Sequence, residues 1–496
     1  MRTRWATVIT ISTLVSTACG ARSDPSMETP TVDETVGTGA GWGGSGETGC
    51  ALGTVEPCRT DALGACGQGQ RTCTEPGVWG ECESAAPTAE NCMLPGDESC
   101  DGVEHVCSGS VDWALPVGDE AQEIFYDVTV DGAGHVVVVG TSYLVGTGEN
   151  QATMGFLVLK VSSEGEILWS HTFDGFVQVG SVGTDSENNI YVAAYSDECV
   201  FGAAPCAQPG QFVAKLNPDG QPVWVRGLDG DSISPVLAVS ANGLIATVVY
   251  SPGSSTVVVM NVDGEEVSRF PAVPSAEVRD LAFDPDGNVV MVGVLHTLSH
   301  EPFVAKTDSL GTPIWHKQYY GGIFNKLAIN PAGDIFVVGT PWGNQADLIF
   351  DTTVAPFDSM FGVKFSVDGD EVWVRTIALP RWDEGVMFDV AVDTLGNPVL
   401  VGFFDGPIDF GFGPEQGSED SFFVKLDRED GRSLWTSFVR GMGGADFIHA
   451  VASDGNHAHY AVGTFSSAVV VAGGIEVAHW RRTTGEGDAL LLKISE

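Results

Sequence analysis

The chain has 496 residues, of which 66 are acidic and 23 basic, so its formal net charge is −43. This acidic excess argues against nucleic acid as a partner, because phosphate backbones are bound by clustered lysines and arginines. The length and a hydrophobic content of 43% allow a sizeable core and more than one domain.

The N-terminus has the pattern of an export signal. Arg2 and Arg4 precede the apolar run Trp5–Val15, which is too short to span a bilayer as a stable helix. No other apolar run in the sequence is long enough to span a membrane. We therefore expect any attachment to a membrane to be through a lipid anchor alone.

Small residues lead from the apolar run to Cys19. This arrangement resembles bacterial lipoprotein signals, although Ser16 stands where that family usually has leucine. The resemblance implies a signal peptide at 1–18, a lipidated Cys19, and a protein of the outer membrane or cell surface. The alternative is ordinary cleavage near Ala18, which would give a secreted chain.

The stretch that follows the anchor, residues 19–49, is rich in Gly, Thr, Ser, Glu and Pro. It offers almost nothing to bury, so the sequence predicts a flexible linker.

Eight cysteines fall within residues 50–108. A segment this short cannot build a sufficient core, and we expect disulfides to hold it together. Zinc is the competing interpretation, but no Cys-x2-Cys pair is present and export favours oxidised cysteines. The sequence does not choose among the possible pairings. The cysteines are Cys50, Cys58, Cys66, Cys73, Cys82, Cys92, Cys100 and Cys107.

Residues 98–112, ESCDGVEHVCSGSVD, resemble a family of Cys-Asp-Gly motifs described as metal-binding. The resemblance implies a carboxylate site suited to Ca²⁺, since hard cations prefer oxygen ligands. Val106 and Ser108 stand where the family has acids, so a disulfide-held spacer without metal is the alternative. The implied ligands are Glu98, Asp101, Glu104 and Asp112.

The remainder of the chain repeats one string, FVAKLNPDGQPVW at Phe212–Trp224. Apolar runs of period two joined by a short Asp/Gly turn predict β-hairpins, and their recurrence predicts a repeat architecture. The third copy has Val259 in place of the lysine. The other copies are Leu157–Trp169, Thr256–Ser268, Phe303–Trp315, Phe361–Trp373, Phe422–Trp435 and the partial copy Leu490–Lys493.

A second marker precedes each copy: an Asp, Asn or Ser that opens a tight turn between two strands. Each repeat then has four strands, A to D, which is the composition of a propeller blade. We predict an all-β fold, a seven-bladed β-propeller over 109–496 preceded by the small disulfide-rich module. It resembles bacterial β-propeller repeats of surface and secreted proteins. The turn openers are Asp131, Asp185, Ser240, Asp284, Asn330, Asp393 and Asp454.

The predicted ring needs one more strand, because the last repeat ends without strand D. Val111–Gly118 resembles the Trp-bearing D strands of the other repeats. We expect this N-terminal strand to complete the last blade and so remove an exposed edge.

Six of the eight lysines occupy the same position in the repeats. A catalytic lysine would not be needed six times, so we expect these side chains either to extend their charged ends to solvent or to pair with acidic neighbours in the same blade. The tryptophans of strand D are expected to pack between blades. The lysines are Lys160, Lys215, Lys306, Lys364, Lys425 and Lys493.

The loops between strands B and C vary in length and emerge on one face, which predicts the binding face. The longest are Pro341–Met360, Phe403–Asp420 and Phe465–Asp488. In the second repeat this loop carries Cys199 and Cys206, which we expect to pair with each other. We expect a protein or a glycan as partner on this face, and a monomeric chain.

The sequence favours a non-catalytic cell-surface lipoprotein whose propeller is an interaction scaffold. An enzyme, a quinoprotein-like dehydrogenase or a hydrolase, is the alternative, because Asp427–Trp435 resembles the tryptophan-docking repeat of quinone-cofactor propellers. That repeat also occurs in non-catalytic propellers, and no phosphate loop or nucleophile elbow is present. A calcium-dependent adhesin acting through residues 98–112 is the third hypothesis. No catalytic residue and no cofactor is assigned, and Ca²⁺ is the candidate cofactor.

Overall fold

The structure is a computed structural model whose chain divides into two compact units, described separately below. Every regular element among the described residues is a β-strand. Those residues contain no helix long and apolar enough to cross a membrane. The described residues are 50–59, 68–84, 109–118, 122–144, 153–175, 177–196, 210–230, 235–251, 254–297, 301–341, 347–356, 359–379, 385–441, 446–455, 457–465, 469–471, 475–477 and 488–495.

The N-terminal unit contains one small antiparallel sheet in the order β1-β2-β3, with β4 paired to β2. Its strands are β1 (Val55–Arg59), β2 (Gln68–Glu75), β3 (Val78–Trp79) and β4 (Glu83–Ser84).

Disulfides hold this unit together. Cys50 is bonded to Cys73 and Cys58 to Cys82. The large aliphatic side chains here are exposed, Leu52 among them at 68%, so apolar burial contributes little. The four cysteines therefore do what a hydrophobic core does in a larger domain, and they indicate an oxidising compartment.

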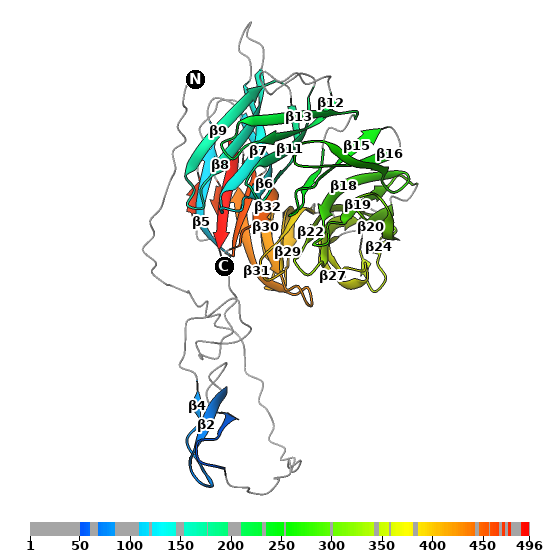
Figure 1. Cartoon of the computed structure of the whole chain (residues 1–496). Coiled ribbons are helices and arrows are strands. Elements are labelled where there is room, and N and C mark those ends of the chain that lie inside the picture. Colours follow the sequence, from blue (N-terminus) through cyan, green and yellow to red (C-terminus); the bar gives the residue numbers. More distant parts are fainter. Residues whose placement is uncertain are drawn as a thin grey trace. The chain divides into compact units, whose positions relative to one another are not determined.

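Among the described residues, the second unit contains seven antiparallel sheets built on four strands, in chain order except for the last strand of the seventh sheet (Figure 1). Two further strands extend the sixth sheet, and β24 (Leu348–Ile349) and β25 (Val354–Ala355) form a separate two-stranded sheet. The first is β6 (Gln122–Val130), β7 (Val136–Leu144), β8 (Thr153–Val161), β9 (Ile167–Asp174); the second β10 (Val177–Thr184), β11 (Ile190–Ser196), β12 (Gly210–Leu216), β13 (Pro222–Leu228); the third β14 (Leu237–Val239), β15 (Ile245–Ser251), β16 (Ser254–Met260), β17 (Glu266–Pro271). The fourth is β18 (Ala276–Phe283), β19 (Val289–Leu295), β20 (Glu301–Thr307), β21 (Pro313–Gln318); the fifth β22 (Gly322–Ile329), β23 (Ile335–Pro341), β26 (Ser359–Phe365), β27 (Glu371–Ala378). The sixth is β28 (Gly385–Val392), β29 (Pro398–Ile408), β30 (Glu415–Leu426), β31 (Ser433–Gly441); the seventh β32 (Phe447–Ser453), β33 (Ala458–Phe465), β36 (Asp488–Ser495), β5 (Ser110–Val117).

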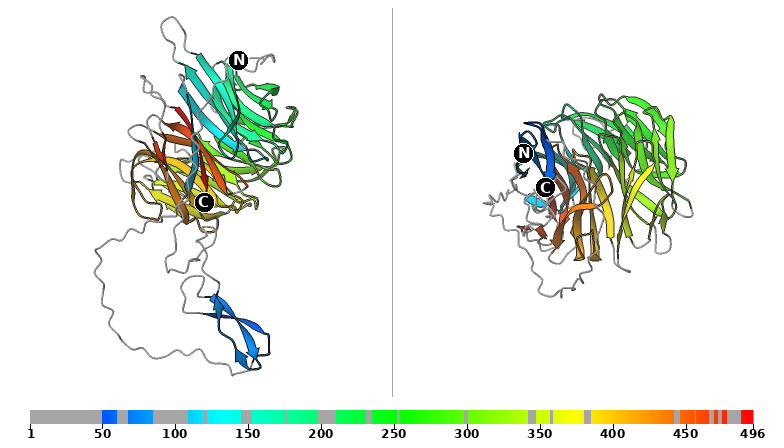
Figure 2. Two further views of the ribbon diagram at one scale, coloured as in Figure 1. Left: turned by 90° about the vertical axis from the view of Figure 1, so that its left-hand side faces the viewer. Right: turned by 90° about the horizontal axis from the view of Figure 1, so that it is seen from below.

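The sheets follow one another in a closed cycle. The first strand of each sheet contacts the first strand of the next, in the order β6, β10, β14, β18, β22, β28, β32 and back to β6. Both further views show the successive sheets side by side (Figure 2). The first strands therefore form the inside of a propeller-like ring, and the fourth strands form its outside.

The N-terminal strand completes the seventh sheet, as the sequence predicts. β5 pairs with β36, and Trp113 lies opposite Lys493. The same register places Trp315 opposite Lys306 in the fourth sheet. β5 thus occupies the position of the fourth strand, which in the other sheets follows the third strand directly in the chain.

The hydrophobic core lies between the sheets. Val136–Val139 are all fully buried, because both faces of this inner strand are covered by neighbouring sheets. One apolar cluster joins Val137 and Val158 of the first sheet to Val192 and Ala214 of the second. Strands buried on both faces read as continuous apolar runs, which explains the valine-rich second and third strands.

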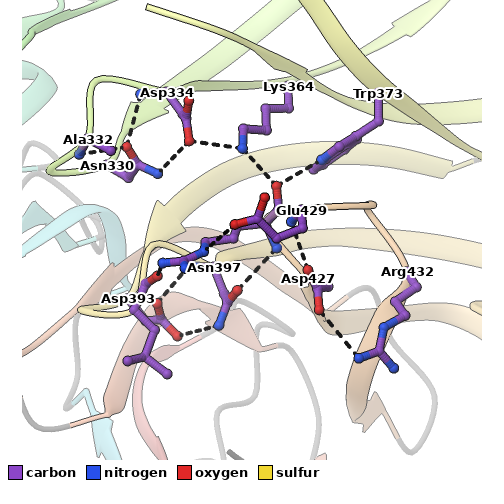
Figure 3. A network of polar contacts seen from close by, with 12 residues as sticks. Asn330, Ala332, Asp334, Lys364, Trp373, Asp393, Asn397, Asp427, Glu429 and Arg432 are labelled. Atoms are coloured by element: carbon purple, nitrogen blue, oxygen red, sulfur yellow. Dashed lines mark hydrogen bonds and ion pairs between the residues drawn. The ribbon is translucent and has the colours of Figure 1, made fainter. Parts of the chain in front are cut away.

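Polar contacts also join the sheets, and Figure 3 shows them between the fifth and the sixth. Lys364 Nζ lies 2.9 Å from a carboxylate oxygen of Asp334 in its own sheet. It also donates to the carbonyl of Arg428, in the turn of the next sheet, at 2.9 Å. The Trp373 indole N–H donates to the same carbonyl at 3.1 Å. We call this carboxylate–lysine–tryptophan group, closed on a neighbouring carbonyl, the junction latch.

The same latch recurs at four more junctions, so the prediction of paired lysines and packed tryptophans is confirmed. In each, a lysine and a tryptophan donate to one turn carbonyl of the next sheet at 3.0–3.3 Å. The lysine also lies within ion-pair distance of an aspartate. The groups are Lys160/Trp169 to Pro218, Lys215/Trp224 to Val262, Lys306/Trp315 to Val367, and Lys493/Trp113 to Ser163.

The third sheet lacks both ionic members of the latch. Ser240 stands in place of the aspartate and Val259 in place of the lysine, so neither charge is left buried alone. Ser268 replaces the tryptophan, and its hydroxyl donates to the carbonyl of Ser309 at 2.5 Å. The charged pair is thus lost as a unit, while one hydrogen bond across the junction remains.

The long loops between second and third strands bend back over the preceding sheet. β34 (Val469–Val471), from the seventh sheet's loop, pairs with β31 of the sixth and carries β35 (Ile475–Val477). The sixth sheet's loop continues as strands through Ile408 and from Glu415, and its Phe410 carbonyl accepts from Arg375 of the fifth at 3.1 Å. The described parts of these loops therefore cover outer strands, which is a structural use of their length.

The fourth sheet's latch provides a test of the charged pair. Lys306→Val alone leaves the carboxylate of Asp284 buried without its cation, and we expect a loss of ~3 kcal/mol in the free energy of unfolding. The double variant Asp284→Ser/Lys306→Val reproduces the pair found in the third sheet, and we expect it to recover most of that loss. Urea unfolding of the whole protein measures both. Equal losses in the single and double variants would contradict the latch.

Candidate functional site

A β-bulge recurs in the first strands of the sheets. In β6 the pairing with β7 skips one residue between Phe125 and Asp127, which leaves Tyr126 as the extra residue. Five other first strands skip a residue at the equivalent position, five residues before the turn opener. Bulges re-aim side chains and are over-represented beside functional sites. The bulged residues are Tyr126, Gly180, Arg279, Asn325, Phe388 and His449.

Five of these side chains, from five different sheets, form two groups: the rings of Tyr126 and Phe388 contact His449, and Arg279 is hydrogen-bonded to Asn325. We call Tyr126, Arg279, Asn325, Phe388 and His449 the central bulge cluster. Because the strands that carry them form the inside of the ring, contacts between them place the cluster at the centre of the ring.

One half of the cluster is aromatic. The His449 ring lies 6.4 Å from that of Tyr126 and 6.0 Å from that of Phe388. Phe403 and Phe447 add to this group, with their ring centroids 5.1 Å apart and both within 6.3 Å of Phe388. Tyr126 is 37% exposed and the other rings are half-buried, so this aromatic surface is accessible.

The other half of the cluster is polar. Arg279 donates to the side-chain oxygen of Asn325 at 3.2 Å, and Asn325 donates to the Met387 carbonyl at 3.3 Å. Arg279 also pairs with Glu277 at 3.1 Å, and Glu277 lies 3.3 Å from the exposed His296. The charge of Arg279 is thus matched by a carboxylate within its own sheet.

The residue after the bulge is an aspartate in three sheets and a lysine in a fourth. Asp127, Asp280 and Asp389 each accept a backbone N–H from the first strand of the next sheet, at 2.8–3.0 Å. Lys326 Nζ lies 3.6 Å from Asp280. These four groups, the central ionic set, join neighbouring sheets on the inside as the latches do farther out.

Burial raises the pKa of all three carboxyl groups, because the charge of Lys326 compensates only in part. The pKa of Asp389 rises to about 7. Burial would lower the pKa of Lys326, but the carboxylates outweigh it and raise that pKa. Lys326 therefore stays charged at neutral pH. Its side chain is 30% exposed, so water reaches this set.

His449 is neutral at physiological pH. Burial lowers the pKa of its imidazole to about 4. Its Nε2 lies 3.3 Å from the hydroxyl of Thr464. An uncharged ring at this place extends the aromatic surface and adds no positive charge to it.

The centre of the ring therefore carries two aromatic residues, Tyr126 and Phe388, each followed directly in the chain by an aspartate, Asp127 or Asp389. Within the described part of the chain, no three His, Cys, Asp or Glu side chains are grouped as a metal site. The arrangement is suited to binding a ligand that has both apolar surface and polar groups.

Of the predicted metal ligands, Asp112 is described, and it lies on the closing strand β5. Its carboxylate accepts from the Ser495 hydroxyl at 2.5 Å and lies 3.6 Å from Lys493. It thus serves as the acidic member of the seventh sheet's latch. The other predicted site residues lie outside the described residues: Cys19, Cys66, Cys92, Glu98, Cys100, Asp101, Glu104, Cys107, Cys199 and Cys206.

Sequence reasoning missed the central residues, although a signal for them exists. An aspartate precedes the turn opener by four residues in DVTVD, DLAFD and DVAVD, which contain Asp127, Asp280 and Asp389. The residue just before that aspartate is the bulged one. The period of the repeats could have located both positions, but the bulge itself is a backbone feature that apolar alternation does not reveal.

The pKa of Asp389 predicts a pH effect with a definite sign. Because this pKa is about 7 in the folded protein and 3.8 ordinarily, the folded state holds the proton more tightly. The resulting stability is present below about pH 4 and is lost as the pH rises through 7. Asp389→Asn cannot lose it, so we expect its Tm relative to the wild type to rise by roughly 3–5 °C between pH 4.5 and 8.

Asp219→Asn, at an exposed turn, is the matched control and should show a constant difference in Tm across this pH range. A constant difference for Asp389→Asn as well would contradict the assignment.

No protein-family model matches the chain. An uncharacterized WD repeat-containing protein of Acanthamoeba polyphaga mimivirus is 25% identical over 389 residues, 64% of this chain and 26% of the relative, so the chain spans about a quarter of that protein. The WD40 repeats of RRP9 superpose with a TM-score of 0.46 and 10% identity, over 79% of this chain and 100% of theirs. Virginiamycin B lyase from Staphylococcus aureus gives a TM-score of 0.43 and 9% identity, over 76% of this chain and 98% of its own. These similarities assign no activity to this chain.

Proposed function

We propose that the protein is an exported, non-catalytic interaction scaffold, and that the centre of its ring binds the partner. In this proposal the seven sheets are the blades of one propeller, and Cys19 and residues 19–49 tether it to the outer membrane or cell surface. The partner is a protein or a glycan, and the scaffold is a monomer. The disulfides of the N-terminal unit are in accord with export.

One observation carries this proposal. Positions that hold the ring together keep the same residue type in repeat after repeat, as the latch lysine does. The bulged position holds a different residue in every sheet where it is described: Tyr, Gly, Arg, Asn, Phe and His. A position whose backbone is fixed and whose side chain varies supports a binding surface on a rigid scaffold.

The long loops are weaker candidates for the binding site than the sequence predicts. The hairpin between β29 and β30 places Phe410 among buried side chains, and its carbonyl accepts from Arg375 and from Ser433. The exposed Phe412 remains a candidate contact on this loop. The loops and the ring centre are therefore alternative locations for the partner within one hypothesis.

Site-specific photo-crosslinking separates these locations. A benzoylphenylalanine replaces Tyr126 at the centre, Phe412 on the loop, or Ile314 on the outer strand β21 as control; all three native side chains are exposed. Cells that export the full chain are irradiated, and adducts are identified by mass spectrometry and glycan staining. We expect an adduct from position 126 and none from 314.

An adduct from position 412 alone would move the site to the loops. The absence of a specific adduct at both position 126 and position 412 would contradict the proposal.

A further inference from the structure

The central bulge cluster has a chemistry that selects among partners, and this inference rests on the function proposed above. We propose that the cluster receives a cationic side chain, an ammonium or guanidinium, from a basic segment of a protein partner.

Charge is the first argument. The central ionic set has three carboxyl groups, Asp127, Asp280 and Asp389, against the single ammonium of Lys326. The other cation nearby, Arg279, is already paired with Glu277. A second cation at the centre would compensate carboxyl groups that outnumber the cations beside them among the described residues, and buried charge is stabilised only when it is paired.

The aromatic surface is the second argument. Tyr126, Phe388 and Phe447 lie around His449, which is uncharged at neutral pH, and Phe403 packs on Phe388 and Phe447. The faces of such rings attract cations within about 6 Å of the centroid, more strongly when water is partly excluded. The apolar stem of a lysine or arginine can pack on the same rings.

The competing ligands fit less well. A neutral sugar could stack on the rings, but it would leave the carboxylates uncompensated. A divalent cation would need several free carboxylate oxygens in one place, whereas each aspartate uses an oxygen to accept a backbone N–H. An anionic partner is disfavoured by the net charge of −43.

Calorimetric titration of the whole protein tests the proposal with blocked peptides. The probes are Gly-Gly-Lys-Gly-Gly, Gly-Gly-Arg-Gly-Gly and Gly-Gly-norleucine-Gly-Gly, because norleucine keeps the stem of lysine without its charge. We expect the lysine and arginine peptides to bind at least tenfold more tightly than the norleucine peptide. Asp389→Asn should weaken their binding at least fivefold, and Phe388→Ala should do the same through loss of the ring.

Asp219→Asn is the matched control, since it removes the same charge from an exposed turn. An equal loss in this variant would show general attraction to an acidic protein and would overturn the proposal. Equal binding of the norleucine peptide would overturn it in favour of an apolar ligand. Binding of CaCl2 that depends on Asp389, without binding of the basic peptides, would overturn it in favour of a metal.

The two proposals can fail separately. An adduct from position 126 with a partner that lacks a basic segment would leave the scaffold function standing and overturn the cationic ligand. Failure of both crosslinking and peptide binding would overturn both.

Discussion

The ring depends on how the hydrogen-bond donors of a lysine ammonium find acceptors between two sheets. An ammonium in an apolar interior is stable only if its donors are used, and each latch lysine finds an acceptor in its own sheet and another in the next. Lys306, for example, lies 2.6 Å from Asp284 and 3.2 Å from the Val367 carbonyl. Apolar packing between sheets tolerates sliding, whereas this pair of acceptors admits one alignment. The latches therefore fix the alignment of neighbouring sheets as well as stabilising the ring.

The junction between the sixth and seventh sheets keeps the ionic pair of the latch, with Lys425 Nζ 2.6 Å from a carboxylate oxygen of Asp393. Trp435 stands at the tryptophan position and is 2% exposed, but its N–H has no acceptor among the described residues. The carbonyl equivalent to those of the other turns would belong to Glu496, which lies outside them. Here β34 and β35 extend the sixth sheet, and their valines join Val111 of β5 and Trp435 in one apolar cluster. Apolar burial thus seals the junction at which the N-terminal strand enters.

The sequence predicted the fold's repeating parts because they follow from period-two patterning and from turn chemistry. The lysine–tryptophan register, the turn openers and the entry of Val111–Gly118 into the last sheet are all local or periodic signals. Sequence could not show where the long loops go, since pairing of β34 with β31 is a long-range choice. It also could not show the central cluster, whose members come from five sheets and meet only after the ring closes.

The same repeat therefore treats charged side chains differently on the inside and on the outside of the ring. Farther from the centre, the charged groups are paired with one another, so their charges are compensated within the folded chain. At the centre, three aspartates are bonded to neighbouring strands but share one lysine, and burial raises the pKa of their carboxyl groups by more than that lysine lowers it. Stability alone would favour neutral side chains there, as Val236 in the third sheet and Ala450 in the seventh illustrate at the equivalent position. An excess of buried carboxylates beside accessible aromatic rings is costly to the folded chain, and a cationic ligand would offset that cost.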